Sequence, residues 1–250
     1  METELRITDH RPWPVPSGPW IMRMTWEHLA FLHWPVLEST IQPHLPPGLE
    51  LDTFEGTAWI GVVPFLMSDV RARGLPPFPS TSEFLELNVR TYVKRDGKPG
   101  VWFFSLDAGS WLSVRTARLG FHLPYFDADM DASFRDDIAY RSRRTHSGSA
   151  PGEFRAKYRP DGELFQSKPG SLEHWLTERY CLYSADRSGR VYRGEIHHRP
   201  WPLQKCAAKV TENSMGTLIG HAFNGPPESV LFARRIDVAA WLIHRCRSDF

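Results

Sequence analysis

The stretch FLELNVRTYV, residues 84–93, alternates apolar and polar side chains and therefore predicts a β-strand with two unlike faces. It runs through KRDGKPG into the apolar segment VWFFSLD, so the two segments are expected to form a hairpin that turns near Asp96-Gly97. One face of the first strand is aliphatic. The other face carries Phe84, Glu86, Asn88, Arg90 and Tyr92.

The pairing of the two strands follows from the length of the turn. A loop with an even number of residues pairs even-numbered positions with odd-numbered ones. With a four-residue loop, Arg90 is expected opposite Ser105 and Asn88 opposite Asp107. The other face, which includes Leu106, is expected to lie in the core.

Two interpretations of the polar face stay open at this point. One face of an antiparallel hairpin commonly meets water, and its charges then form ordinary cross-strand pairs. A cavity wall is the alternative, because such walls are mainly apolar with a few placed polar groups. The aromatic members of the face favour the cavity, since Phe84, Tyr92 and Phe103 are unusual together on a plain wet surface.

The whole chain predicts an α+β fold that is mostly antiparallel β. Many short strand-like segments follow one another with few helices and no βαβ rhythm, which indicates a closed or nearly closed sheet. Residues 1–19 are rich in proline and are expected to form an irregular arm, and residues 20–250 a single domain. Helices are expected at residues 26–34 after an N-cap at Thr25, at 35–42, at 110–120, and at 172–180 after Ser171.

Composition excludes several classes of protein. Among 250 residues, 30 basic and 29 acidic side chains leave a net charge of +1, which gives no field for nucleic acid or an anionic membrane. The longest nearly apolar run, residues 58–67, is too short to cross a bilayer. Three distant cysteines and a charged, proline-rich N-terminus without a signal-peptide core predict a reduced, cytoplasmic setting.

No motif for a cofactor or a metal is present. The sequence lacks the glycine-rich nucleotide-binding patterns, the zinc motif HExxH and the nucleophile pattern GxSxG. His28 and His33 are five residues apart, and His197 and His198 are adjacent, so neither pair places two ligands on one face of a helix or strand. We therefore expect no cofactor and no metal, and a small molecule as the binding partner.

Seven segments spread over nearly the whole chain match one family of conserved proteins. They are HW (33–34), LPPGLELDTFEGTAWIGVVPF (45–65), ELNVRTYV (86–93), GVWFFSLDA (100–108), AR and LPY within 117–125, LEHWLTERY (172–180) and HHRPWPL (197–203). On these segments the chain resembles the YqjF-like family. That family belongs with the acetoacetate decarboxylase-like proteins, so the resemblance implies a large antiparallel β-cone around a buried pocket. It also allows a homo-oligomer, because related decarboxylases assemble into large oligomers.

The resemblance to the decarboxylases implies a site residue by residue. Glu86, in Phe-Leu-Glu, matches the glutamate that reaches the active site, and Arg118 matches the arginine of a Gly-Arg-Glu motif. The arginine that binds the substrate carboxylate is missing, and His33 is its nearest substitute. Tyr125 stands where the family has the lysine that forms the Schiff base. Because tyrosine cannot form an imine, decarboxylation by that route is not expected.

Two functions are compatible with these residues. In the first, Glu86 and Tyr125 perform metal-free acid–base chemistry on a small carbonyl or carboxylate metabolite. In the second, the same pocket binds or senses such a molecule without turning it over. Structural roles are open for every candidate: an ion pair between Glu86 and Arg118, or a core tyrosine at Tyr125. The candidate substrate-binding residues are Arg118, Arg90, Asn88, His33 and Asp107.

Overall fold

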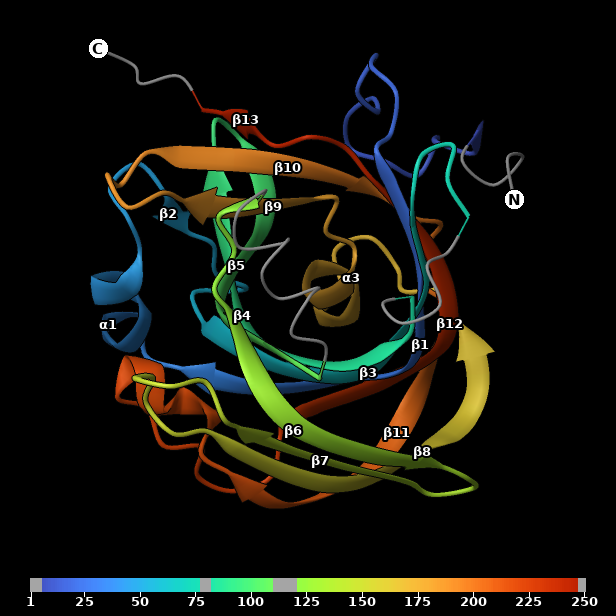
Figure 1. The fold of residues 1–250 in the computed structure, drawn as a ribbon, viewed down its shortest axis with the longest axis vertical. Helices are drawn as coiled ribbons and strands as arrows, with labels where there is room; N and C mark the ends of the chain where they lie inside the picture. The colour runs from blue at the N-terminus through green and yellow to red at the C-terminus, as the bar shows by residue number, and fades with distance from the viewer. Residues whose placement is uncertain (1–5, 77–81, 110–120, 247–250) are drawn as a thin grey trace.

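The computed structural model describes residues 6–76, 82–109 and 121–246, so Arg118 and the predicted helix at 110–120 lie outside the described residues. The described chain is mostly antiparallel β with a few short helices, which confirms the predicted α+β class (Figure 1). The helices are α1 (Glu38–Ile41), α3 (Leu172–Thr177) and two short 3₁₀ turns, Gln42–His44 and Met215–Ile219. The strands are β1 (Met22–Val36), β2 (Glu50–Leu51), β3 (Ala58–Ala72), β4 (Phe84–Arg95), β5 (Lys98–Ala108), β6 (Tyr125–Phe134), β7 (Ile138–Arg144), β8 (Glu153–Phe165), β9 (Cys181–Ala185), β10 (Val191–His197), β11 (Leu203–Asn213), β12 (Ser229–Ala240) and β13 (His244–Arg245).

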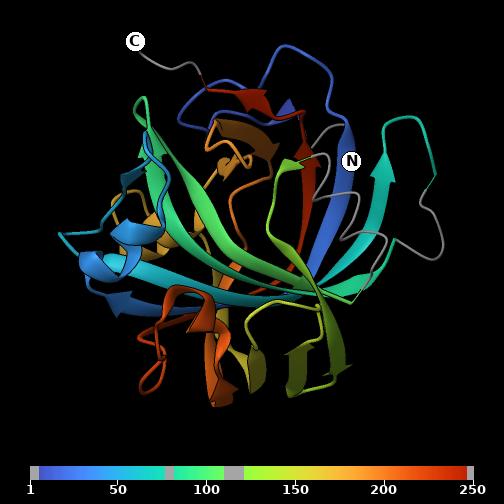
Figure 2. The same cartoon turned by 60° about the vertical axis from the view of Figure 1, so that its left-hand side comes forward.

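The strand pairings close two barrels that share one wall. The first barrel runs β10–β12–β1–β3–β4–β5–β9 and back to β10. The second runs β5–β6–β7–β8–β11–β12–β1–β3–β4 and back to β5, and lies below the first in Figures 1 and 2. The shared wall therefore consists of β12, β1, β3, β4 and β5. All pairings are antiparallel except those of β5 with β6 and with β9.

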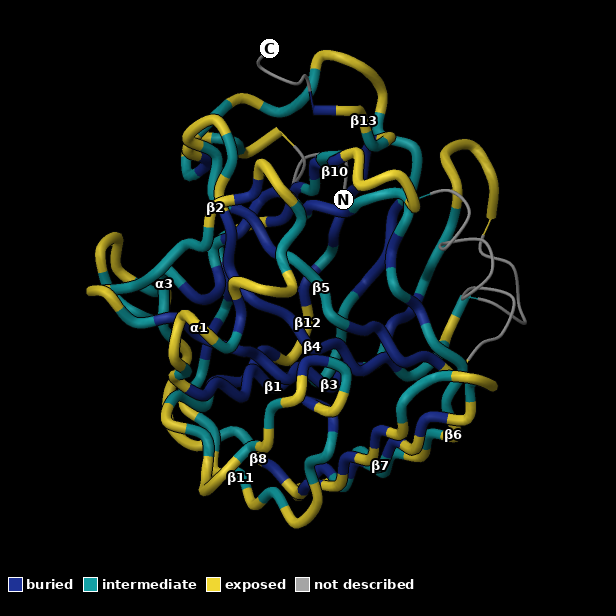
Figure 3. Tube along the Cα trace, turned by 90° about the vertical axis from the view of Figure 1, so that its left-hand side faces the viewer, coloured by how far each residue is buried: buried dark blue, intermediate teal, exposed yellow. Residues whose placement is uncertain are grey.

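The shared wall is buried on both faces, as the dark band through the middle of Figure 3 shows. In β3, Val63 and Phe65 belong to the core of the first barrel, whereas Ile60 and Val62 belong to that of the second. Burial on both faces places apolar side chains at nearly every position. Residues 26–34 are mostly apolar and lie within strand β1, so the helix predicted there is wrong. A mostly apolar run without alternation does not distinguish a buried strand from a buried helix.

The hairpin of β4 and β5 corrects the predicted register. Its turn is the two-residue Asp96-Gly97, both with positive φ (51° and 70°), which matches the twist of the strands. Arg90 pairs with Phe103, but the register shifts by one residue at the next pair, Val89 with Ser105. The expected pairings of Arg90 with Ser105 and of Asn88 with Asp107 are therefore wrong.

The register shift is a β-bulge at Phe104, and it exchanges the two faces of β5 beyond that point. Leu106, expected in the core, pairs with Asn88 and joins the polar face of β4. Asp107 pairs with Leu87 and moves to the side of the second barrel. The bulge lies where β5 stops pairing with β9 and starts pairing with β6, so it marks the passage of the strand from one barrel to the other.

The helices are shorter than predicted. The segment 35–42 is helical only from Glu38, and 172–180 only through Thr177, although the Ser171 hydroxyl accepts from the His174 N–H as expected of an N-cap. Helix α3 lies within the ring of the first barrel in Figure 1, and Leu176 packs there against Trp59 and Tyr92. None of the helices in the described part of the chain is long and apolar enough to cross a membrane.

Gly100 allows β5 to approach β9, and its replacement by alanine is expected to destabilise the first barrel. A Cβ at Gly100 would lie 2.7 Å from Cys181 Sγ and 2.8 Å from the Cys181 carbonyl oxygen, which is backbone and cannot rotate away. Overpacking of this kind costs about 1–3 kcal/mol. Thermal unfolding of Gly100→Ala should show a clear loss. The control Gly18→Ala, where no atom lies within 4 Å, should unfold near the wild-type temperature; equal behaviour of the two variants would contradict the argument.

Candidate functional site

The first barrel holds a cavity of about 330 Å³, within the range of small-molecule sites. Its wall is mostly aliphatic and aromatic. The polar members come from β4, from the start of β6, from the end of α3 and from the segments that follow α3 and β10. They are Glu86, Asn88, Arg90, Tyr125, Thr177, Arg179 and His198.

The registers of the strands order the wall into layers. On β3, Gly61 lies beside Arg90, Val63 beside Asn88, Phe65 beside Glu86, and Met67 beside Phe84. Successive layers are two residues apart, which is roughly 7 Å along a strand. The polar face predicted from the sequence thus lies on a cavity wall except for Tyr92, which does not line the cavity. Arg90 lies towards one end of the wall and Glu86 lies two layers away.

Glu86 and Tyr125 form a buried hydrogen-bonded pair. The Tyr125 hydroxyl donates to Glu86 Oε2 at 3.0 Å, and Glu86 is 2 % exposed. Burial, opposed by the Tyr125 hydrogen bond, raises the pKa of Glu86 to about 8, and the nearby charge of Asp107 adds to the rise. Glu86 Oε1 has no hydrogen-bond partner among the described residues. A carboxyl group with this pKa can release or accept a proton near neutral pH.

Asp107 does not line the cavity. Arg144 binds it through two hydrogen bonds, Nη2 to Oδ1 at 2.7 Å and Nε to Oδ2 at 2.9 Å, and both side chains are fully buried. Burial raises the pKa of Asp107, and the hydrogen bonds and charge of Arg144 oppose this shift. The structure thus places this predicted substrate-binding residue in an ion pair behind the wall, because the bulge at Phe104 turned it away.

His33 also lies off the cavity wall, next to Arg90 and Tyr92. The Tyr92 hydroxyl donates its single proton to the Leu176 carbonyl at 3.0 Å, so His33 Nε2, 2.6 Å from the hydroxyl oxygen, is the donor in that contact. Burial and the charge of Arg90 hold the pKa of His33 well below its usual value. His33 is therefore a neutral imidazole that fixes Tyr92, and its geometry gives it no contact with a molecule in the cavity.

Arg90 and Arg179 bring two guanidinium groups to one end of the cavity. Arg90 Nη2 donates to the Leu176 carbonyl at 3.2 Å, and the side chain is 9 % exposed. Arg179 Nη1 donates to Asp52 Oδ2 at 2.7 Å, and its guanidinium lies over the ring of Trp175 at 4.4 Å. Arg179 thus has a carboxylate partner. Arg90 has no ion pair with any described residue.

Arg179 received no role from the sequence, although it lies in the segment LEHWLTERY that carries the family resemblance. Its position on the cavity wall depends on Asp52, which is 127 residues away in the chain. No local pattern reports such a contact. His198 also lines the cavity, and its ring stacks on Tyr180 at 4.7 Å.

No described lysine lines the cavity. Lys205, the most apolar in its sequence context, points outward on β11 and pairs with Glu173 at 2.9 Å. In residues 6–76, 82–109 and 121–246, no three His, Cys, Asp or Glu side chains are grouped as a metal site requires.

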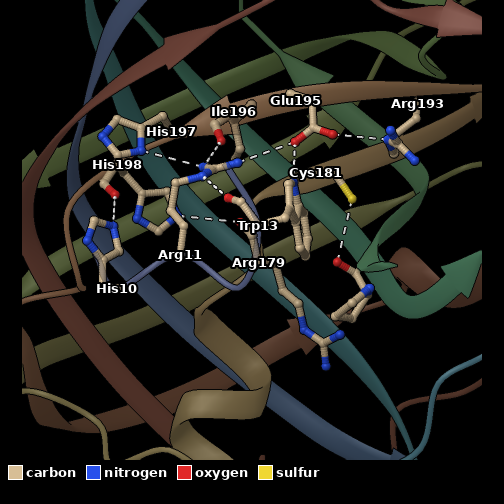
Figure 4. Close-up of polar contacts among 11 residues, drawn as sticks. His10, Arg11, Trp13, Arg179, Cys181, Arg193, Glu195, Ile196, His197 and His198 are labelled. Carbon is tan, nitrogen blue, oxygen red and sulfur yellow. Dashed lines mark hydrogen bonds and ion pairs between the residues drawn. The ribbon is translucent and has the colours of Figure 1, made fainter. Parts of the chain in front are cut away.

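Residues of the N-terminal arm bind β10 and the residue that follows it through the polar contacts drawn in Figure 4. Arg11 donates to the carbonyl of Ile196 at 2.6 Å and contacts Glu195 Oε2 at 3.3 Å. Trp13 Nε1 donates to the same oxygen at 2.8 Å, and Arg193 reaches Glu195 Oε1 at 3.0 Å. Because the side chain of Ile196 lines the cavity, the arm supports that wall from behind.

Glu195 is the residue on which this attachment depends, so Glu195→Gln is expected to be strongly destabilising. The substitution leaves the two guanidinium groups that meet at Glu195 without a counter-charge, and breaking a buried pair costs about 3–5 kcal/mol. Urea unfolding measures the loss. The control Arg190→Gln breaks an ion pair with Asp186 in which the arginine is 51 % exposed, and should cost far less because water screens that pair. A comparable loss in both variants would refute the role of Glu195.

Glu86→Gln is expected to change how stability depends on pH. Between pH 4.5 and 8 the unfolded chain releases the Glu86 proton while the folded chain keeps it, so the wild-type free energy of unfolding falls as pH rises through this window. Each pKa unit corresponds to about 1.4 kcal/mol. The variant lacks this loss. Urea unfolding at pH 5, 7 and 9 should therefore show that the free energy of unfolding of the variant, relative to that of the wild type, increases as pH rises. The control substitutes the exposed Glu212 by Gln, and its curve of unfolding free energy against pH should be parallel to that of the wild type. A parallel curve for Glu86→Gln would contradict the raised pKa of Glu86.

A family model described as an uncharacterised conserved protein, DUF2071, matches residues 23–237. The chain belongs to this family. It is 44 % identical to the uncharacterised protein YqjF of Bacillus subtilis (strain 168) over 232 residues, which are 92 % of this chain and 95 % of that protein. The resemblance inferred from the sequence is therefore confirmed.

Solved structures with the same fold are acetoacetate decarboxylase-like proteins. An acetoacetate decarboxylase-like enzyme of Sphingomonas wittichii RW1 has a TM-score of 0.63 at 11 % identity, over 96 % of this chain and 98 % of that one. The acetoacetate decarboxylase of Legionella pneumophila has a TM-score of 0.60 at 12 % identity, over 96 % and 93 %. The enduracididine biosynthesis enzyme MppR, complexed with pyruvate, has a TM-score of 0.60 at 12 % identity, over 91 % of each chain. At these identities the likeness establishes the fold alone.

Proposed function

We propose that the protein binds a small monoanionic carbonyl or carboxylate metabolite in the first barrel, in the cytoplasm, and that Glu86 and Tyr125 perform metal-free acid–base chemistry on it. The observation that carries this proposal is Arg90. A buried guanidinium without a carboxylate partner is costly, and an anionic ligand removes that cost. The same fold in MppR accommodates pyruvate, a small oxo acid, which is compatible with the proposal.

The charges around the cavity favour a ligand with a single negative charge. The positive charge of Arg179 is matched by Asp52, and the negative charge of Asp107 by Arg144. Glu86, with a pKa of about 8, is neutral in most molecules at pH 7. Among the described residues that line the cavity, one positive charge, that of Arg90, is left over, so a monoanion completes the balance.

The Glu86–Tyr125 pair supplies the proposed chemistry. Burial and Glu86 raise the pKa of Tyr125 well above its usual value, so its hydroxyl remains a donor to the carboxyl group. The ionised fraction of Glu86 takes a proton from the carbon beside a carbonyl group, which leaves an enolate. The protonated Glu86 then returns that proton to the enolate oxygen, or to another carbon of the enolate, and is ionised again. Enolisation, hydration–dehydration and aldol-type steps all use such transfers. A Schiff base takes no part in this proposal, because Tyr125 stands at the position that matches the Schiff-base lysine of the acetoacetate decarboxylases.

Arg90→Met is the decisive variant, and two opposite effects are expected from it. The variant without ligand should melt at a higher temperature than the wild type, because an uncompensated buried charge is replaced by an apolar chain; Leu176 keeps the Tyr92 hydroxyl as its donor. The variant should also lose the stabilisation by carboxylates. A ligand at a hundred times its Kd stabilises the wild type by about 2.7 kcal/mol, on the order of 5–10 °C.

Thermal unfolding against oxo acids, hydroxy acids and neutral carbonyl compounds measures both effects. Arg159→Met, an exposed arginine on β8, is the matched control and should respond like the wild type. Carboxylate binding that survives in Arg90→Met would overturn the proposal. A ligand found in this way is then incubated with the wild type and with Glu86→Gln: turnover by the wild type alone supports the enzyme, whereas ligand recovered unchanged from both supports the alternative, a binding or sensing protein.

A further inference from the structure

The cavity wall changes character along the barrel, which bears on the kind of ligand that it takes. Arg90 and Glu86 line the cavity and form no ion pair with any described residue, and they lie two layers apart on the wall. Beyond Glu86 the register leads to Phe84 beside Met67, and Met67 in turn pairs with Trp26 on β1. Met22 and Val70 continue the wall, and none of the described residues that line the cavity beyond the Glu86 layer is charged. The cavity therefore has a cationic end and an apolar end.

Aromatic side chains line the wall from Phe31, over whose ring the Arg90 guanidinium lies at 5.3 Å, to Trp26 at the apolar end. The rings of Trp26 and Trp201 stack at 6.0 Å with an interplanar angle of 18°. Phe65 meets Trp26 edge-on at 5.8 Å, and Phe31 meets Trp201 edge-on at 4.9 Å. All four residues line the cavity. Such rings offer large, rigid apolar surfaces to a ligand, and the flexible methionines nearby adapt to its outline.

We infer that the ligand is an amphiphilic monoanion, with a carboxylate at Arg90 and an alkyl or aryl body that extends past Glu86 to Trp26 and Met67. This inference rests on the proposed function and names its substrate class. An oxo acid as small as pyruvate would engage the cationic end and leave the apolar end without a partner. Burial of a hydrocarbon body against that end supplies the affinity that a short acid lacks.

The same arrangement locates the reacting part of the ligand. Glu86 lies between the layer that holds the anion and the layer of Trp26 and Met67. The Glu86 carboxyl group therefore faces the ligand between its head and the far end of its body. Side chains at the apolar end select the body by its length, and Arg90 selects the charge.

Isothermal titration with straight-chain carboxylates from acetate to decanoate tests this inference, with 3-phenylpropanoate as the aryl probe and the primary amide of each acid as its uncharged control. The Kd is expected to fall about four-fold per added methylene, the equivalent of about 0.8 kcal/mol, until the apolar end is full. The amides should bind at least ten-fold more weakly. A Kd that stays flat or rises with chain length, while pyruvate or acetoacetate binds, would overturn the inference and leave the proposed function standing.

Val70→Phe is the matching variant, since Val70 lines the apolar end. The added ring should remove the gain for long acids and leave short ones unchanged. Val230→Phe, at a partly buried site that packs on the core of the second barrel, is the control and should keep the full length dependence. Length dependence that persists in Val70→Phe would contradict the placement of the body. Absence of binding by every acid, short or long, would instead reject the proposed function itself.

Discussion

The structure depends on a wall of five strands that must be buried on both faces. Strands β12, β1, β3, β4 and β5 close the first barrel and the second barrel at once, so successive residues along each strand serve different cores. In β4 this alternation separates two chemistries. Leu87 and Val89 complete the apolar core of the second barrel, whereas Glu86, Asn88 and Arg90 face the cavity. The buried polar side chains of the cavity are tolerable here because the second barrel supplies a large, mostly apolar core.

The bulge at Phe104 is what allows one strand to take part in both barrels. Before it, β5 pairs with β9 and Phe103 faces the cavity; after it, β5 pairs with β6 and Leu106 takes over that face. Without the extra residue, Asp107 would face the cavity beside Glu86, and two carboxyl groups would compete for one proton. The bulge instead places Asp107 beside Arg144. From this position behind the wall, the negative charge of Asp107 still raises the pKa of Glu86.

The sequence predicted the structure correctly where the local residue pattern matches the environment of each side chain in the fold. Alternation in FLELNVRTYV placed Glu86, Asn88 and Arg90 on one face, because the two faces of β4 differ in polarity. Prediction failed for residues 26–34, where burial on both sides removes the alternation that marks a strand. It failed for Asp107 because the bulge lies within Trp-Phe-Phe-Ser, with no glycine or proline to mark it. Arg179 was missed because its position depends on Asp52, a contact between distant parts of the chain.

Tyr140 connects the two barrels by hydrogen bonds as well as by packing. It lies in β7, in the core of the second barrel, yet its hydroxyl donates to the backbone carbonyl of Glu86 at 2.8 Å and also lies 3.3 Å from that of Phe65. Both carbonyls belong to residues whose side chains line the cavity of the other barrel. A small shift of β7 would therefore move Glu86, the proposed acid–base residue, without any change on the cavity wall itself. Substitutions in the second barrel can therefore reposition Glu86 while every residue that lines the cavity stays as it is.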